Sequence, residues 1–301
     1  MLNLVKNYLQ TITVSVLLCW ALIQSNNVEA IVMRHDVDPS EYLLDSLDYQ
    51  STIVILGCTA TLIAPRWILT AAHCVYPNNT KGNKAGDEIT LLDQTITINA
   101  IHSHPNHTQE GTLKHDIALI ELSEPSFSIL PTPLYEQNNE LNKEMKLVGY
   151  GVVGDGVRDI YDRCFPCDLR GADNEVEEAN DYQLRFRFDS PADGKSLPLE
   201  GVGAGGDSGG PAFIETDTGR YVAGVSSFGS RHYNEFDNYT RVSKELNWLA
   251  EVMAADYQGS YSGPLHSELN QEPTNRNSGG SFGFIILIGL FVLRTYRQLK
   301  T

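Results

Sequence analysis

The most constraining feature of this sequence is a glycine-rich stretch at residues 201–211, with Ser208 inside it. Six of its eleven residues are glycine, so the backbone there can adopt positive φ angles and approach a ligand closely. A serine in such a loop, directly after Asp207, is typical of an exposed nucleophile with main-chain amides beside it. A plain glycine-rich turn has the same composition, so the stretch alone leaves both interpretations open.

Short runs rich in β-branched residues, separated by turn residues, recur along the chain. Strands of this length and spacing favour an all-β sandwich or barrel. One segment of the body, residues 243–255, has the apolar spacing of a helix, with Ser243 as its expected N-cap. The expected strands are 53–55, 59–63, 67–70, 88–92, 94–101, 117–121, 146–150, 182–188, 212–216 and 221–227.

Residues 1–30 have the pattern of a secretory signal peptide. Lys6 lies near the start, an apolar run follows at 14–23, and small residues end the segment at Ala30. We expect signal peptidase to remove this segment, which would make Ile31 the first residue of the mature chain.

A second apolar run, at residues 282–293, is followed by Arg294, Arg297 and Lys300. A bilayer-spanning helix needs roughly 20 apolar residues, so this run is short for one. A linker at 258–281, rich in Gly, Ser, Asn and Pro, separates the run from the body and argues against a buried core helix. We expect residues 282–301 to attach the chain to a membrane, transiently or permanently, with the basic end on the cytoplasmic side.

The charge and the cysteines narrow the class of protein. A formal net charge of −16 argues against nucleic acid or an anionic membrane surface as partner.

One of the five cysteines, Cys19, lies in the expected signal peptide. An even count in an exported body indicates disulfides, but the sequence leaves their pairing open. The four body cysteines are Cys58, Cys74, Cys164 and Cys167.

Three motifs occur in a fixed order: TAAHC ending at Cys74, DIAL beginning at Asp116, and GDSGGP around Ser208. Together they resemble the trypsin/chymotrypsin family of serine endopeptidases. The separations, 43 residues from His73 to Asp116 and 92 from Asp116 to Ser208, also fit that family. The resemblance implies an all-β fold of two six-stranded antiparallel barrels with a C-terminal helix, in a protease domain at residues 31–257.

The resemblance also implies a role for each motif residue. Ser208 would be the nucleophile, His73 the general base and acid, and Asp116 the carboxylate that orients the imidazole. Histidine suits this role because it titrates close to neutral pH. The backbone amides of Gly206 and Ser208 would stabilise the oxyanion. The alternative, from another class, is an inactive protease-like binding protein at the cell surface.

Members of this family need a free amino terminus, usually an Ile-Val pair, to insert beside the aspartate before the nucleophile. Here Ile31-Val32 directly follows the expected signal cleavage site. We therefore expect signal peptidase itself to expose the activating terminus, and the Ile31 ammonium to pair with the Asp207 carboxylate.

The specificity pocket departs from the family pattern. Val202 stands at its floor and favours apolar or small side chains, and Ala204 replaces a cysteine that usually clamps the pocket. Asp237 occupies a second pocket-lining position, where a carboxylate can receive Arg or Lys, so the sequence leaves the preference at the scissile bond open. The strand expected to pair with peptide substrate contains Ser227, Phe228 and Gly229.

The resemblance pairs Cys58 with Cys74, as in the family's histidine-loop disulfide. Cys164 and Cys167 have the Cys-x-x-Cys spacing of a redox pair. Since they lie in a polar, acidic segment without a βαβ context, a local disulfide is the expected interpretation and a redox module the alternative.

A histidine-rich segment suggests a metal site, because imidazoles are common ligands. The same segment aligns with the family's loop before the catalytic aspartate, where a His-Pro pair is ordinary. We expect no metal ion and no cofactor. The histidines concerned are His102, His104 and His107.

The far end resembles a GlyGly-type C-terminal sorting signal of Gram-negative bacteria. It has Ser278-Gly279-Gly280, a short apolar run and a basic terminus. In that class an intramembrane protease cuts the segment and the protein passes to the surface or the medium; a permanent anchor is the competing interpretation. The expected partners are protein or peptide substrates, signal peptidase and that sorting protease, and the expected location is the cell surface or the extracellular medium.

Overall fold

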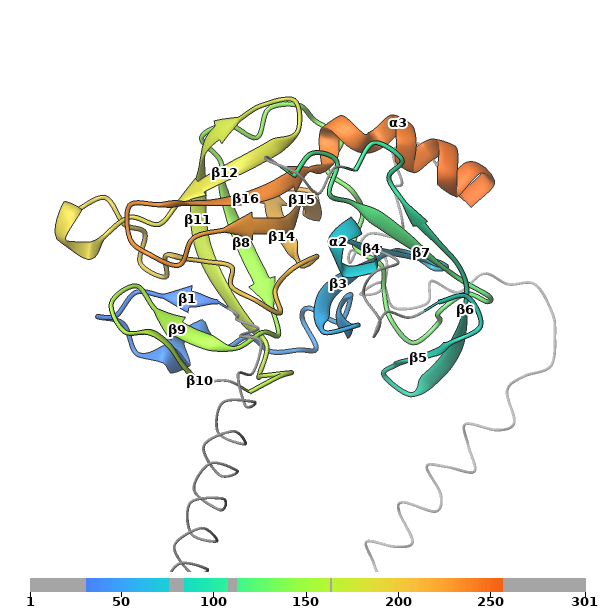
Figure 1. The fold of residues 1–301 in the computed structure, drawn as a ribbon, viewed down its shortest axis with the longest axis horizontal. Coiled ribbons are helices and arrows are strands. Elements are labelled where there is room, and N and C mark those ends of the chain that lie inside the picture. The colour runs from blue at the N-terminus through green and yellow to red at the C-terminus, as the bar shows by residue number, and fades with distance from the viewer. Residues whose placement is uncertain (1–30, 76–83, 108–112, 163, 257–301) are drawn as a thin grey trace, which may run out of the picture. The chain divides into compact units, whose positions relative to one another are not determined.

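The computed structural model describes residues 31–75, 84–107, 113–162 and 164–256 (Figure 1). The expected signal peptide, the linker and the C-terminal apolar run lie outside these residues. Among the described helices, none has both the length and the apolar character needed to cross a membrane. The described chain is mostly β-structure with one long helix, so the predicted two-barrel all-β fold is confirmed.

The first six-stranded sheet has the order β2-β3-β4-β7-β6-β5. Its centre forms because β3 and β4 are continuous apolar or β-branched runs that are buried along their whole length. The side chains of β3, β4 and β7 make up most of one large apolar core. The strands are β2 (Thr52–Ile55), β3 (Cys58–Ala64), β4 (Trp67–Thr70), β5 (Glu88–Leu91), β6 (Gln94–Ser103) and β7 (Ala118–Leu122).

The second six strands close into a barrel in the order β11-β12-β16-β15-β14-β8. The sequence analysis did not predict β11. Its exposed residues are mostly acidic, and one of the three alternating buried positions, Ala172, Asn174 and Val176, is polar, so the strand lacks a clear apolar alternation. They also missed β16. The strands are β8 (Glu144–Gly149), β11 (Arg170–Ala179), β12 (Gln183–Arg187), β14 (Pro211–Thr216), β15 (Gly219–Gly229) and β16 (Phe236–Arg241).

A small third sheet, in the order β10-β9-β1-β13, ties the start of the described chain to the glycine-rich stretch. Val32 pairs antiparallel with Val202 and parallel with Gly154. These strands are too short to leave a sequence pattern, so only the tertiary fold defines them. Their bounds are β1 (Val32–Met33), β9 (Val153–Asp155), β10 (Asp159–Asp162) and β13 (Gly201–Val202).

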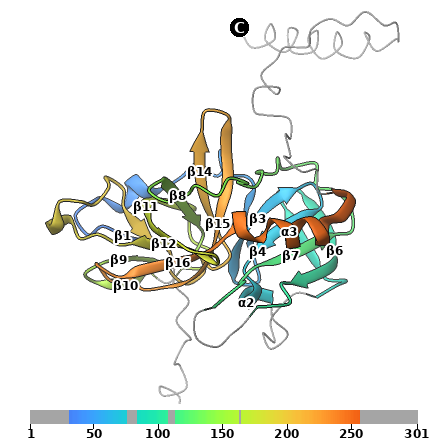
Figure 2. The same ribbon diagram turned by 90° about the horizontal axis from the view of Figure 1, so that it is seen from above.

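Helix α3 (Val242–Met253) packs against the first sheet through Val242, Leu249 and Met253, which belong to its core (Figure 2). The predicted cap is wrong. Arg241 is the N-cap residue and makes no side-chain cap bond, whereas Ser243 lies in the first turn and donates its hydroxyl to Glu140. A short helix, α2 (Ala72–Val75), follows β4. Single 3-10 turns occur at η1 (Pro39–Tyr42), η2 (Pro191–Asp193) and η3 (Ala254–Asp256).

Replacing Phe186 by Ala should destabilise the fold by about 3–5 kcal/mol, because the change opens a cavity inside the closed barrel. Phe186 is 0% exposed and lies edge-on to Tyr239, with ring centroids 5.2 Å apart. Urea denaturation measures the change. The matched control is Phe127→Ala, whose side chain is 84% exposed and whose loss should change stability by no more than about 0.5 kcal/mol. Equal effects of the two substitutions would contradict this account of the barrel core.

Candidate active site

His73 and Asp116 are joined by two hydrogen bonds. His73 lies on α2, directly after β4, and Asp116 lies just before β7, the strand that pairs with β4. The ring atom Nδ1 of His73 is 2.7 Å from Oδ2 of Asp116, and the backbone N–H of His73 donates to Oδ1 at 2.9 Å. The carboxylate is wholly buried, whereas the imidazole is 28% exposed, so one face of the ring remains open to a reactant.

The second barrel completes the environment of Asp116. Ser227 on β15 donates its hydroxyl to Oδ2 at 2.5 Å, and Thr240 on β16 donates to the Asp116 carbonyl at 2.9 Å. Burial alone would raise the pKa of Asp116, but the hydrogen bonds and charge of His73 and the hydroxyl of Ser227 outweigh it and hold the pKa below its usual value. The carboxylate is therefore ionised and acts only as an acceptor.

Ser208 lies beside this pair, in a loop shaped by glycines in the left-handed region. Gly206 has φ +96° and Gly209 φ +78°, and a Cβ at Gly209 would lie 2.1 Å from the hydroxyl of Thr70. The carbonyl of Ser208 accepts from the N–H of Thr59 at 2.9 Å and contacts Cys74 Sγ at 3.6 Å. The nucleophile predicted from sequence is thus placed next to the helix that carries His73.

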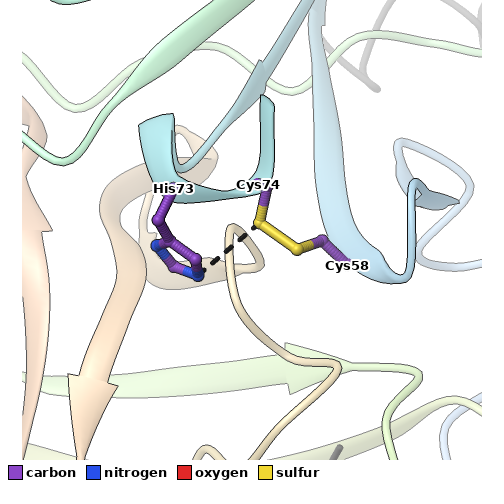
Figure 3. Close-up of side chains that lie close together, drawn as sticks. All are labelled: Cys58, His73 and Cys74. Atoms are coloured by element: carbon purple, nitrogen blue, oxygen red, sulfur yellow. Dashed lines mark hydrogen bonds between the residues drawn. A yellow bond between two sulfur atoms is a disulfide. The ribbon is translucent and has the colours of Figure 1, made fainter. Parts of the chain in front are cut away.

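The described side chains of His73 and Ser208 share no hydrogen bond. Nε2 of His73 instead lies 3.7 Å from Cys74 Sγ (Figure 3). Hydrogen bonds between a nucleophile and its base are often long in a free enzyme and tighten only when a ligand binds. The structure therefore brings His73 and Asp116 together directly, and brings Ser208 near them through its backbone.

Some backbone amides of the glycine-rich loop have no protein acceptor. Within the described part of the chain, the N–H groups of Gly205, Gly206 and Ser208 donate to no protein acceptor, whereas those of Asp207, Gly209 and Gly210 each donate to a carbonyl. Unpaired amides beside a serine are suited to hold a negatively charged oxygen.

Two disulfides fall where the sequence analysis expected them. Cys58–Cys74 joins β3 to the helix of His73, and Cys164–Cys167 closes a local loop. Because the sulfurs of Cys58 and Cys74 are bonded to each other, these atoms are not thiolates and do not form a metal site with His73.

Asp207 is buried without an ion pair among the described residues. Its carboxylate accepts from the N–H of Gly151 at 3.2 Å and of Ala204 at 3.1 Å, while burial raises its pKa to about 6. Ile31, which is 1% exposed, lies in the same apolar cluster as Val152, the residue after Gly151. In the full chain the nitrogen of Ile31 is a peptide amide, so it carries no charge.

Asp237 lies on β16 with its side chain between two glycines. The N–H of Gly203 donates to Oδ2 at 2.7 Å, and a Cβ added to Gly229 would lie 2.1 Å from Oδ1. Burial raises the pKa of Asp237 to about 8. Val202 is also fully buried, but it packs in a small apolar cluster with Val32 and Phe188. Ser227, Phe228 and Gly229 all lie on β15, next to β16.

The histidine-rich segment does not form one site. His102 lies 3.8 Å from Glu121, His107 lies 3.8 Å from Oδ1 of Asp116, and His104 faces Glu245 on α3. Each of the three histidines therefore lies next to a different carboxylate.

Sequence reasoning missed a buried cluster in which His104 and His115 both face Glu245. Glu245 lies in the first turn of α3, and Leu249 and Met253 follow it at four-residue spacing. That spacing places the carboxylate on the buried face of α3 and was the signal available.

This donor set, two imidazoles and a carboxylate, is of the kind that binds zinc. The N–H of Asn106, however, donates to Nδ1 of His104. The proton of a neutral His104 ring therefore lies on Nε2, the atom that faces Glu245, and leaves no lone pair there for a metal. The rings of His104 and His115 are also stacked, with an angle of 6° between their planes, so their in-plane lone pairs do not converge on one point.

Comparisons with known proteins agree with this geometry. The family model described as Trypsin matches residues 38–249. The chain is 30% identical over 234 residues to urokinase-type plasminogen activator of Gallus gallus, covering 68% of this chain and 52% of that protein. It is 29% identical over 240 residues to tryptase of Mus musculus, covering 70% and 84%. It is 26% identical over 214 residues to vitamin K-dependent protein C of Rattus norvegicus, covering 64% and 45%.

The chain thus spans about half the length of two of these relatives and most of the third. The matched residues run from the first 3-10 turn to helix α3 and include His73, Asp116 and Ser208. This chain belongs to the trypsin family of serine endopeptidases.

Proposed function

We propose that this protein is an exported serine endopeptidase that hydrolyses peptide bonds through an acyl-enzyme on Ser208. The observation that carries the proposal is the short contact between His73 and the buried, ionised Asp116, beside a serine loop in which the amides of Gly206 and Ser208 are unpaired. These are the parts that nucleophilic acyl transfer requires.

In the proposed reaction, Nε2 of His73 takes the proton of the Ser208 hydroxyl while Oγ attacks the substrate carbonyl. Asp116 holds the ring through Nδ1–H and stabilises its charged form. The imidazolium then gives its proton to the departing amine, which leaves an ester on Ser208. A water molecule, deprotonated by the same ring, hydrolyses that ester and restores the free serine.

The N–H groups of Gly206 and Ser208 would hold the oxyanion of both tetrahedral intermediates. Removing one such donor typically costs about 2.7–4 kcal/mol in the barrier. The left-handed φ of Gly206 supports this role, because it lets the loop turn its amides toward one point.

Substituting Ser208 by Ala should abolish labelling by a fluorophosphonate probe and lower kcat/KM for a peptide by a factor of about 10⁴ or more. His73→Ala should also abolish labelling although Ser208 remains, since no base would activate the hydroxyl. His102→Ala, a histidine on β6 that faces Glu121, is the control and should be labelled normally. Labelling of the His73 variant at the normal rate would contradict the proposed mechanism.

We further propose that cleavage after Ala30 frees the Ile31 ammonium to pair with Asp207. Support comes from the environment of Asp207, a buried carboxylate whose pKa is raised by burial and which has no ion pair among the described residues. A cation there would offset the cost of the buried charge. It would also hold the loop that carries the Gly206 and Ser208 amides.

The mature protein with Asp207→Asn should lose about 10²-fold or more in kcat/KM, because the oxyanion donors would lose their position. Edman sequencing of the exported protein should begin at Ile31. The control is Asp193→Asn, an exposed aspartate of the η2 turn, which should keep normal activity. A mature start far from Ile31, or an unimpaired Asp207→Asn variant, would refute this activation route.

For the residue before the scissile bond, we propose Arg or Lys, received by Asp237 rather than excluded by Val202. The carboxyl lies between Gly203 and Gly229 beside the substrate-pairing strand β15, and burial raises its pKa to about 8. It is therefore mostly protonated at pH 7 in the free protein. A substrate cation would favour the ionised form, so binding would release a proton.

The ratio of kcat/KM for an Arg substrate to that for a Leu substrate should rise by up to tenfold per pH unit below about pH 8, and level off above it. Taking the ratio cancels the pH dependence of the reaction steps that both substrates share. Asp237→Asn keeps the size of the side chain and should abolish both the Arg preference and its pH dependence. A ratio that is flat with pH, or unchanged in the Asn variant, would leave Val202 as the determinant.

The expected export signal at 1–30, the linker at 258–281 and the segment at 282–301 support a location at the cell surface or in the medium. The two disulfides fit an oxidising compartment. We propose that signal peptidase acts at the first segment and an intramembrane sorting protease at the last. The mass of the exported protein reports both processing events.

A further inference from the structure

The buried cluster around Glu245 connects helix α3 to the segment that carries Asp116. Glu245 is only 2% exposed, and both of its oxygens are used. Nδ1 of His115 lies 2.9 Å from Oε1 and 3.2 Å from Oε2, and Nε2 of His104 lies 3.4 Å from Oε2. One buried carboxylate thus faces two imidazoles, which stack on each other with centroids 4.4 Å apart.

The protons of the cluster follow from its hydrogen bonds. His104 accepts the N–H of Asn106 at Nδ1, so it presents Nε2–H to Glu245 and stays neutral. Its burial, together with the nearby His115 and His107, lowers the pKa of His104 to about 4. Nδ1 of His115 makes the shorter of the two contacts with Glu245.

Aromatic rings cover the cluster. Trp248 of α3 lies edge-on to His104 and Tyr182 lies edge-on to His115. The other charged or titratable groups nearby are Lys114, whose ammonium lies 4.6 Å from the centroid of the Tyr182 ring, His107 and Asp116 itself.

His115 immediately precedes Asp116 and has φ +51°, a left-handed conformation that non-glycine residues adopt at a cost. Its carbonyl accepts the N–H of Ile117 at 2.8 Å, and the carbonyl of Ile117 accepts the N–H of His104 at 3.0 Å. The residues on both sides of Asp116 are therefore held by the cluster. A shift of the His115 ring would turn the backbone from which the Asp116 carboxylate extends.

We infer that Glu245 is a positioning residue for catalysis. It holds the His115 side chain, fixes the left-handed backbone before Asp116, and so sets the carboxylate where it can orient the His73 ring. Helix α3 thereby takes part in the reaction. This inference rests on the proposed function, because it assigns His73 and Asp116 their catalytic roles.

The test compares Glu245→Gln with Glu251→Gln, a matched change at an exposed position of the same helix. A Gln amide is uncharged and keeps one acceptor oxygen where the carboxylate had two, so the contacts with His104 and His115 should weaken and rearrange. We expect kcat for a peptide substrate to fall between about 10- and 100-fold while KM stays within about twofold, as for a small displacement of a catalytic group. Glu251→Gln should keep both constants.

A second measurement does not depend on turnover. The Nδ1 proton of His73, in its short bond to Asp116, should give a low-field proton NMR signal. In Glu245→Gln this signal should shift or broaden, and in Glu251→Gln its position and width should match those of the wild type. His115→Asn is the second variant, because Asn tolerates positive φ but lacks the imidazole that contacts Glu245. It should lower kcat as Glu245→Gln does, and it decides the question if Glu245→Gln does not fold.

The outcomes separate this inference from the proposed function. A folded Glu245→Gln protein with normal kcat and an unchanged low-field signal would overturn the inference, as would a change in thermal stability alone. If the wild-type protein hydrolyses no peptide, the proposed function fails. The low-field signal then still reports whether Glu245 positions Asp116.

Discussion

The structure depends on satisfying one buried negative charge, that of Asp116. Its carboxylate is shielded from water and receives donors from two separate sheets: His73 after β4 of the first, and Ser227 on β15 of the second. Leaving such a charge unpaired would cost several kcal/mol. The two sheets must therefore meet where α2 and the C-terminal end of β15 face each other. The same junction places the Ser208 loop against Thr59 of β3.

Four buried carboxylates illustrate how local donors decide protonation. For Asp116 the donors outweigh burial, and the pKa falls. For Asp207 and Asp237 backbone N–H groups are present but burial prevails, and the pKa rises to about 6 and about 8. Glu245 is held by two imidazoles while burial raises its pKa. We proposed a different use for each: orienting a base, receiving a new amino terminus, receiving a substrate cation and positioning a loop.

Much of the site could be predicted because its parts lie in short contiguous motifs. His73, Asp116 and Ser208 each stand in a stretch whose spacing is set by the family's loops, and the pair Cys58–Cys74 follows from the same resemblance. His115 and Glu245 lie 130 residues apart, and neither stands in a motif, so their contact left no such signal. The expected helix cap at Ser243 failed for a related reason. Its hydroxyl is taken by Glu140, which is distant in sequence and buried beside Arg241.

The sequence by itself determined the family and most of the strands, and it supplied the candidate reacting groups, since β-branched runs and glycine-rich turns act locally. The tertiary structure decided what depends on burial and on distant partners. It paired Val32 with Val202 and placed Asp237 between Gly203 and Gly229. It also placed each of three histidines that are close in sequence beside a different carboxylate. The physical reason is that a charge or a proton position is set by every group within a few ångströms. Most of those groups come from other parts of the chain.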